Sequence, residues 1–192
     1  MSYNVYTTEA MVVGERASGE QAKVLMLFTR ELGLVQCYAA GLRALKSKLR
    51  YHLQEYSFAY CSLIAGKEYW KLVGVLSVQP RIENGLSIRT AARIAEMCQR
   101  LTGLDDPHPD LFDEFKKAML ASINLVPQHE DDFSTLLTAR ALCHLGYLTH
   151  NEMTYFYLGH EWASSNFFPL PPSVREYLES HIHKGLQASH LG

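Results

Sequence analysis

Residues 22–39 read AKVLMLFTRELGLVQCYA, and this stretch decides the fold class of the first part of the chain. It contains two short apolar runs, Ala22–Thr29 and Leu34–Ala39, with the tight connection Glu31–Gly33 between them. Short runs rich in branched and aromatic residues, bounded by turn residues, are typical of β-strands. We therefore predict two neighbouring strands here.

The segments on either side have the same character. Turn signals containing glycine occur at Gly14–Gly19 and Ala65–Lys67. Three more strands are predicted, over Val5–Val13, Leu53–Ile64 and Tyr69–Val78. Five short strands with no helix among them suggest a small closed barrel, and the OB-fold is the leading candidate.

The apolar pattern takes on a helical period after Pro80 and the turn at Glu83–Gly85. Ser, Thr and Asp favour helix N-termini, and glycine often follows a C-terminus. Helices are predicted to start at Ser87, at Asp110, near Phe133 and at Ser173–Glu176, with a stop at Gly146 and an end near Ala188. Thr149 and Glu152 could form a capping box, with reciprocal hydrogen bonds, for a further short element. We predict an α+β protein with a five-stranded OB-fold barrel over residues 1–81 and an all-α domain over residues 82–192.

The connection after the third strand is strongly basic. Residues 40–54 read AGLRALKSKLRYHLQ, with the cations Arg43, Lys46, Lys48 and Arg50 and no acidic residue from Leu32 to Gln54. A cationic loop on a β scaffold suits a polyanion such as nucleic acid. A solvated surface loop is the alternative.

The charge of the chain is unevenly distributed. Residues 1–81 carry ten Lys and Arg against six Asp and Glu, a net charge of +4. Residues 82–192 carry eight against fourteen, a net charge of −6. This asymmetry predicts different electrostatic roles for the two parts.

The composition is that of an ordinary globular protein: 192 residues, 47% hydrophobic and 20% charged. The apolar runs are too short to span a membrane, and the N-terminus lacks the pattern of a secretory signal. Four cysteines lie far apart, at Cys37, Cys61, Cys98 and Cys143. We expect free, mostly buried thiols and a cytoplasmic location.

Motifs of catalysis are incomplete in this sequence. Gly66-Lys67 is followed by Glu68, where a phosphate loop needs Ser or Thr. His160-Glu161 begins like a zinc-protease helix, but position 164, where the second ligand would stand, is Ser164. The sequence therefore predicts no enzyme activity, no cofactor and no metal.

Motifs along most of the chain resemble the RecO family of bacterial recombination mediators. In the barrel segment they are Thr8–Val13, Gly19-Glu20, Leu27–Gly33, Ala40–Arg43 with Lys46-Ser47, Leu53-Gln54 and Gly66-Lys67. In the helical segment they are Glu96–Arg100, Asp110–Phe112, Leu145–Tyr147 and Gly185–Leu191. The order and spacing of the first set are those of the family.

The resemblance implies an N-terminal OB-fold, a helical C-terminal domain and no catalytic site. It also implies binding of single- and double-stranded DNA, annealing of complementary strands, and work with RecR and the single-strand binding protein SSB. A nucleoid-associated, cytoplasmic location follows from it.

Two features depart from the family pattern. Many members carry a cysteine-rich zinc-binding insertion after the Leu-Gly-Tyr motif, but no cysteine follows Cys143 here, so we expect no zinc. The usual Ala-Lys-Gly before the basic loop is Ala39-Ala40-Gly41, so one expected cation is absent and DNA affinity is expected to be weaker.

Candidate nucleic-acid-binding residues follow from the basic stretch and the strands beside it. They are Arg43, Lys46, Lys48, Arg50, Lys23, Arg30 and Tyr51, and Lys67 and Lys71 could extend the path. Lys and Arg neutralise phosphates whatever the sequence, and aromatic rings stack on bases. Tyr38, Tyr56 and Trp70 are further stacking candidates, although alternation places about half of such residues in a barrel core.

Candidate partner-binding residues lie on the predicted helices. Arg89, Arg93 and Arg100 share a stripe that Arg140 could join, and arginine over an apolar floor would suit the acidic, carboxylate-ended tail of SSB. A salt-bridged solvated face is the alternative. Two rival functions stay open: a non-catalytic OB-fold protein-interaction adaptor, and an RNA-binding module.

Overall fold

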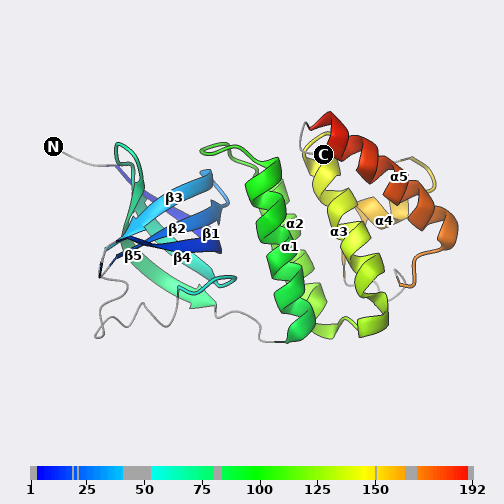
Figure 1. Cartoon of the computed structure of the whole chain (residues 1–192), viewed down its shortest axis with the longest axis horizontal. Coiled ribbons are helices and arrows are strands. Elements are labelled where there is room, and N and C mark those ends of the chain that lie inside the picture. Colours follow the sequence, from blue (N-terminus) through cyan, green and yellow to red (C-terminus); the bar gives the residue numbers. More distant parts are fainter. Residues whose placement is uncertain are drawn as a thin grey trace. The chain divides into compact units, whose positions relative to one another are not determined.

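A computed structural model describes residues 4–18, 20, 22–40, 53–79, 84–149, 151–162 and 168–189. Its N-terminal part is a closed five-stranded barrel with the strand order β1-β2-β3-β5-β4 (Figure 1). The strands are β1 (Val5–Ser18), β2 (Ala22–Thr29), β3 (Gly33–Ala39), β4 (Phe58–Ile64) and β5 (Trp70–Gln79). The predicted OB-fold barrel is confirmed, with all five strands near their predicted positions.

Strand β1 closes the barrel because it pairs with two neighbours. Its first half is antiparallel to β4, from Val5 to Met11, and its second half is antiparallel to β2. A register shift between Val12 and Gly14 marks the change of direction. Bulges of this kind bend a strand and increase its twist, which barrel closure requires. A short parallel pairing of β3 with β5 completes the ring.

Strand β2 is apolar from Val24 to Phe28 because both of its faces are largely buried there. Leu25 and Leu27 belong to the cluster inside the barrel, and Phe28 on the outer side is 1% exposed. The rings of Phe28 and Phe58 pack against Phe112, with centroids 5.8 and 6.1 Å from it. A strand buried on both faces has no polar alternation, which explains the apolar run from Val24 to Phe28.

Contacts between Cα atoms divide the chain into two compact units. The first comprises Met1–Glu83 and Ala91–Phe112, and the second comprises Asn84–Thr90 and Asp113–Gly192. This division differs from the predicted boundary after residue 81, because residues 91–112 pack on the barrel. Within the first unit, Gln99 Nε2 donates to Val13 O over 2.8 Å, and Asp105 N donates to Leu34 O over 2.9 Å.

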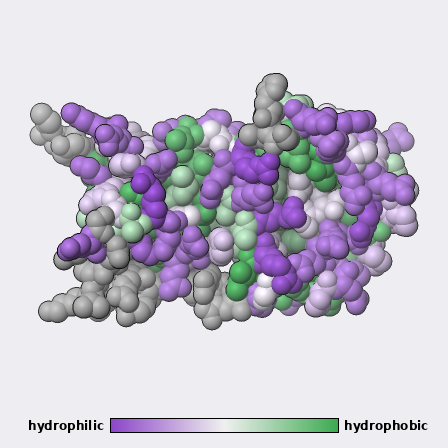
Figure 2. All heavy atoms as spheres, viewed as in Figure 1, coloured by the Kyte–Doolittle hydropathy of each residue, from purple (hydrophilic) through white to green (hydrophobic). Residues whose placement is uncertain are grey.

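The helical elements follow the predicted order. They are α1 (Gly85–Leu101), α2 (Pro109–Ala121), α3 (Glu130–His144), α4 (Tyr155–Gly159) and α5 (Pro172–Ala188), with 3₁₀ turns at Ser122–Asn124 and Pro127–His129. In the second unit α5 packs on α3, and Gly185 makes room for Leu142, whose Cδ1 would lie 3.3 Å from an added Cβ. None of the described helices is both long and apolar enough to cross a membrane. On the face drawn in Figure 2, hydrophilic side chains predominate.

Two predicted helix caps are wrong. Asn84, not Ser87, caps α1 by accepting a hydrogen bond from Ser87 N over 2.7 Å. Ser87 is buried inside the helix and receives a hydrogen bond from Ser122 Oγ. The reciprocal bonds expected of Thr149 and Glu152 join Asn151 and Thr154 instead, just before α4.

A third predicted cap, Ser173, is also wrong, because α5 starts at Pro172 without a side-chain cap. The predicted stop at Gly146 is confirmed. This residue has φ +77°, the left-handed conformation that favours glycine after a helix.

The four cysteines are free, as predicted. Cys37, Cys61 and Cys98 are buried, and Cys143 is half-buried. Burial raises the pKa of Cys37 to about 12 and that of Cys61 to about 11. These thiols are therefore inert core residues at neutral pH.

Candidate nucleic-acid interface

The predicted cations Arg43, Lys46, Lys48 and Arg50, together with Tyr51, lie outside the described residues. The residues that flank their stretch are fixed in the barrel core, because Ala39 and Leu53 are each 1% exposed and belong to the same apolar cluster. The basic stretch is thus tied at both ends to the barrel. Among the described residues, those at the end of β3 directly precede this stretch in the chain.

A row of cross-strand neighbours occupies that end of the barrel. Arg16 pairs with Val24, Val24 with Tyr38, and Tyr38 with Lys71, so the row crosses β1, β2, β3 and β5. These side chains point outward, because the alternate residues of β2 and β3 form the barrel core. We call Arg16, Val24, Tyr38 and Lys71 the outer row.

Tyr69, in the loop before β5, joins the outer row through Arg16. Arg16 Nη2 donates to the Tyr69 hydroxyl over 3.0 Å, and the guanidinium carbon lies 5.7 Å from the ring centroid. The row therefore presents two aromatic rings and two cations beside the β1–β2 and β4–β5 loops. OB-folds bind oligonucleotides with the β2–β3 face and these two loops.

The predicted strand cations are separated by the structure. Lys23 is next to Val24 in β2 but on the other face of the strand, opposite the core residue Ala39, and its Nζ is 2.5 Å from Glu15 Oε1, so part of its charge is balanced. Arg30 lies at the far end of β2, seven residues or roughly 23 Å away, and pairs with Glu31 over 3.4 Å. Arg30 is therefore not part of the surface around the outer row.

The stacking candidates also divide. Tyr38 lies in the outer row and is half-buried. Trp70 was proposed to stack on bases, but its side chain packs against the barrel core, and its Nε1 donates to Asp105 over 2.8 Å. Sequence reasoning missed Arg16 and Tyr69. Arg16 was missed because the first strand was predicted to end at Val13, whereas β1 continues to Ser18.

The arginines of the predicted partner site are mostly engaged. Arg89 makes a two-pronged ion pair with Glu130, in which Nη2 donates to Oε2 over 2.7 Å. Arg100 pairs with Glu96 over 3.0 Å along the same helix. Arg93 is exposed and forms no ion pair with another described residue. These arginines therefore fit the alternative interpretation, a solvated helix face with salt bridges, better than a partner-binding site.

Arg140 is a buried structural residue, which corrects its assignment to the partner site. It is 3% exposed and lies 4.4 Å from the centroid of the Trp162 ring. Its guanidinium donates to the carbonyl oxygens of Tyr157 and His160 and, over 3.1 Å, to Glu114 Oε1. A side chain held by so many groups has no donor arrangement left for an external tail.

Glu114 is the charged partner that this burial requires. Trp162 Nε1 also donates to it over 2.7 Å, and His144 Nε2 lies 3.8 Å from its Oε2. Burial acts to raise the pKa of Glu114, but the hydrogen bonds from His144, Arg140 and Trp162 and the charge of Arg140 outweigh it. The pKa of Glu114 is therefore lowered, and the carboxylate stays ionised.

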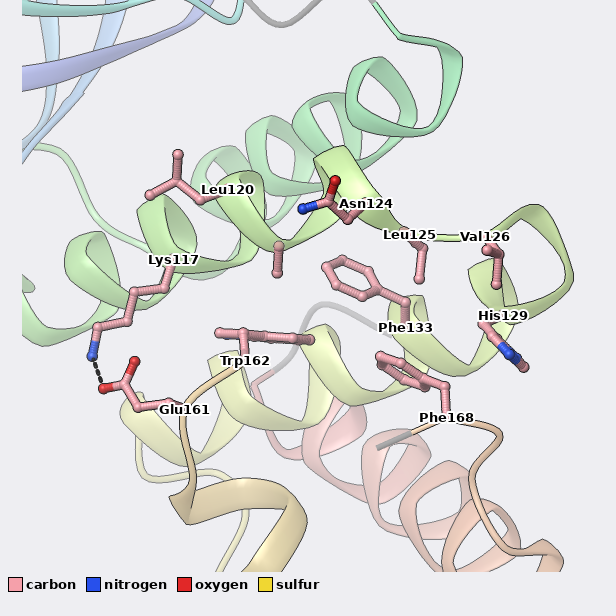
Figure 3. A pocket seen from close by; sticks show the side chains of 11 residues that line it. Lys117, Leu120, Asn124, Leu125, Val126, His129, Phe133, Glu161, Trp162 and Phe168 are labelled. Atoms are coloured by element: carbon pink, nitrogen blue, oxygen red, sulfur yellow. Dashed lines mark hydrogen bonds and ion pairs between the residues drawn. The ribbon is translucent and has the colours of Figure 1, made fainter. Parts of the chain in front are cut away.

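The second unit carries a cavity of about 690 Å³ (Figure 3). Phe133, Trp162 and Phe168 form one of its apolar walls, with Leu120 and Leu125 from the other side. An ion pair of 2.9 Å between Lys117 Nζ and Glu161 lies at one end, and His129 lies at the other. Among the described residues, no group of three or more His, Cys, Asp or Glu side chains could hold a metal ion.

The sequence similarity to known proteins covers the barrel. Residues 1–79 match the family model described as recombination protein O, N terminal. A protein of Desulfitobacterium hafniense (strain DSM 10664 / DCB-2) is 36% identical over 114 residues, which are 56% of this chain and 41% of that protein. One of Legionella pneumophila (strain Lens) is 31% identical over 107 residues, 55% of this chain and 46% of that protein.

Both relatives are named DNA repair protein RecO. A third protein of that name, from Dehalococcoides mccartyi (strain ATCC BAA-2266 / KCTC 15142 / 195), is 31% identical over 94 residues. These residues are 49% of this chain and 37% of that protein. The chain thus spans less than half the length of the curated relatives it matches. The similarity lies where the structure has its five-stranded barrel. Residues 1–79 therefore match the N-terminal domain of the RecO family.

Proposed function

We propose that this protein is a non-catalytic factor of DNA repair and recombination that binds single- and double-stranded DNA and anneals complementary strands. The observation that carries the proposal is the outer row, where Arg16, Tyr38 and Lys71 lie on the OB-fold binding face at the end of β3. The basic stretch 40–54 continues directly from that strand. Relatives named DNA repair protein RecO support the same role.

Binding through phosphates accounts for annealing. Arg and Lys hold the backbone of either strand without reading its sequence. The base edges of a strand held in this way stay free to pair with a complement. Faster pairing of two complementary strands in the presence of the protein is therefore expected, and unchanged pairing rates would count against the annealing role.

Replacing Arg43, Lys46, Lys48 and Arg50 together with alanine is expected to weaken DNA binding and its dependence on salt. Each neutralised phosphate releases counterions, so four contacts contribute on the order of 3–4 to the slope of log affinity against log salt concentration. The slope should fall by that amount in titrations of a labelled strand at several salt concentrations.

A matched variant controls for the loss of net charge. It replaces Arg89, Arg93, Arg100 and Lys184, four cations of α1 and α5, with alanine. This variant should keep the wild-type slope. An equal fall in both variants, or in neither, would contradict the assignment of the basic stretch to phosphate binding.

We further propose that the protein works with RecR and with SSB, and that the acidic tail of SSB docks in the cavity of Figure 3. This cavity offers what the arginine stripe lacks: an apolar floor made by Phe133, Trp162 and Phe168, with a cation, Lys117, at its edge. Lys117 is about half exposed, so a carboxylate of a partner can reach it.

Replacing Lys117 with glutamate is expected to lower the affinity for a labelled SSB tail peptide about fivefold or more, because an attraction of roughly 1 kcal/mol becomes a repulsion. Lys184→Glu, which makes the same charge change at an exposed position of α5, is the control and should bind as wild type does. Equal affinities of the two variants for the peptide would contradict the proposal that the SSB tail binds in this cavity.

A further inference from the structure

A second cavity, of about 480 Å³, lies in the first unit beside the outer row. Its wall on the barrel is the next row of outward side chains, because Gly14 pairs with Met26 and Met26 with Gln36. The opposite wall is α1, with Ala92 and Ala95. Glycine and alanine at these places leave the space open, and its volume suits a ligand of nucleotide size.

The polar groups around this cavity are mainly acceptors. Glu55 is half-buried and makes no hydrogen bond or ion pair with another described residue. One N–H of the Gln99 side-chain amide donates to Val13 O. Its carbonyl oxygen and the Glu55 carboxylate suit a ligand that presents N–H donors.

Tyr56 gives the cavity an aromatic side. Its φ of +70° is uncommon for a bulky residue, and it lies next to Glu55 in the cavity lining. The bond from Tyr56 N to Val12 O, 2.8 Å, holds it against the bulge of β1. The fold thus keeps an aromatic ring at the cavity in a backbone conformation that glycine or asparagine would adopt more easily.

Arg16 connects the cavity to the outer row. It lines the cavity and also bonds to Tyr69. A cation therefore lies where the cavity adjoins the outer row, with Lys71 farther along the same row. This order, cations outside and acceptors with an aromatic ring inside, matches the order of phosphate and base in a nucleic-acid strand.

We propose that this cavity binds one unpaired nucleobase bearing an exocyclic amine while the outer row holds the adjoining phosphates. Cytosine and adenine present an N–H₂ donor where thymine presents a carbonyl oxygen, and carboxylates accept from the amine of cytosine. The inference rests on the proposed DNA-binding function and deepens it. A base inside the cavity is unpaired, so the site favours single strands.

The test measures binding of the full chain to three strands of equal length: oligodeoxycytidine, oligodeoxythymidine and a sugar–phosphate strand without bases. The wild type should bind oligodeoxycytidine about fivefold or more tightly than the other two, the size of effect that one well-held base gives. Ala92→Trp should fill the cavity from the exposed side of α1 and abolish this preference. Ala188→Trp, on α5 of the second unit, should keep it.

A second variant guards against misfolding of the first. Tyr56→Asn removes the ring but tolerates the left-handed backbone, and it should also reduce the preference. Oligodeoxycytidine bound no more tightly than either other strand, or a preference that survives in both variants, would overturn the base site while leaving DNA binding intact. Binding to none of the three strands would overturn the proposed function itself.

Discussion

Replacing Arg140 with leucine is expected to lower the free energy of unfolding by about 3–5 kcal/mol. The change leaves Glu114 ionised and buried, with hydrogen bonds only from Trp162 and His144. It also leaves the carbonyl oxygens of Tyr157 and His160 without their donor. Urea unfolding followed by the fluorescence of Trp162, whose ring lies against Arg140, would report this loss.

Arg89→Leu is the matched control, because it removes an arginine that is also paired with a glutamate. The Arg89 side chain is 59% exposed, and solvent screens such pairs, so a much smaller loss is expected than for Arg140→Leu. Equal losses in the two variants would contradict the structural role of Arg140. A loss of unfolding free energy well below 3 kcal/mol in Arg140→Leu would also contradict this role, whatever the control shows.

The same cluster predicts part of the acid stability of the protein. The pKa of Glu114 is lowered from its ordinary value of 4.5, so ionised Glu114 stabilises the folded state. This contribution is complete above about pH 4.5 and is lost as the pH falls through the lower, folded-state pKa. In Glu114→Gln, unfolding free energies measured below pH 4.5 should change less steeply with pH than in the wild type.

Replacing Gly33 with alanine is expected to cost about 2–5 kcal/mol of unfolding free energy. Gly33 has φ +74°, and a Cβ there would lie 2.1 Å from the carbonyl oxygen of Asp106. The backbone of residues 105–106 would have to move away from β3, which breaks the bond from Asp105 N to Leu34 O. Urea unfolding and the fluorescence of Trp70, which donates to Asp105, would detect both effects.

Gly146→Ala is the control for Gly33→Ala, because it shares the unfavourable backbone conformation but not the clash of the added Cβ. Its φ of +77° is nearly the same, but no atom lies within 4 Å of an added Cβ. The expected loss is only about 1–2 kcal/mol. If Gly33→Ala were no worse than Gly146→Ala, the close packing of residues 105–106 on β3 would not be a determinant of stability.

The sequence alone determined the order and type of the elements in both parts. Turn residues and short apolar runs located five strands, and the change of apolar period located the helices, because these are local signals. The cap of α1 was predicted at Ser87, but Asn84 caps the helix and Ser87 is buried against Ser122, a contact between residues distant in the chain.

The separation of the candidate sites came from the tertiary structure. Lys23 and Arg30 look alike in sequence, but strand length places them at opposite ends of β2. In the sequence Arg140 cannot be told from a surface arginine, but in the structure it is enclosed by Glu114, His160 and Trp162. Contacts between residues distant in the chain decide such cases.

What the sequence determined by itself was the barrel, the basic stretch at residues 40–54 and the resemblance of the barrel to RecO, all of which are encoded in local patterns. What only the tertiary structure decided was which side chains share a surface. Arg16 and Tyr69 meet across 53 residues of chain, and residues 91–112 pack on the barrel they were predicted to leave. The physical reason is that pairing register and burial depend on the whole fold, whereas turns and periodicity depend on neighbours along the chain.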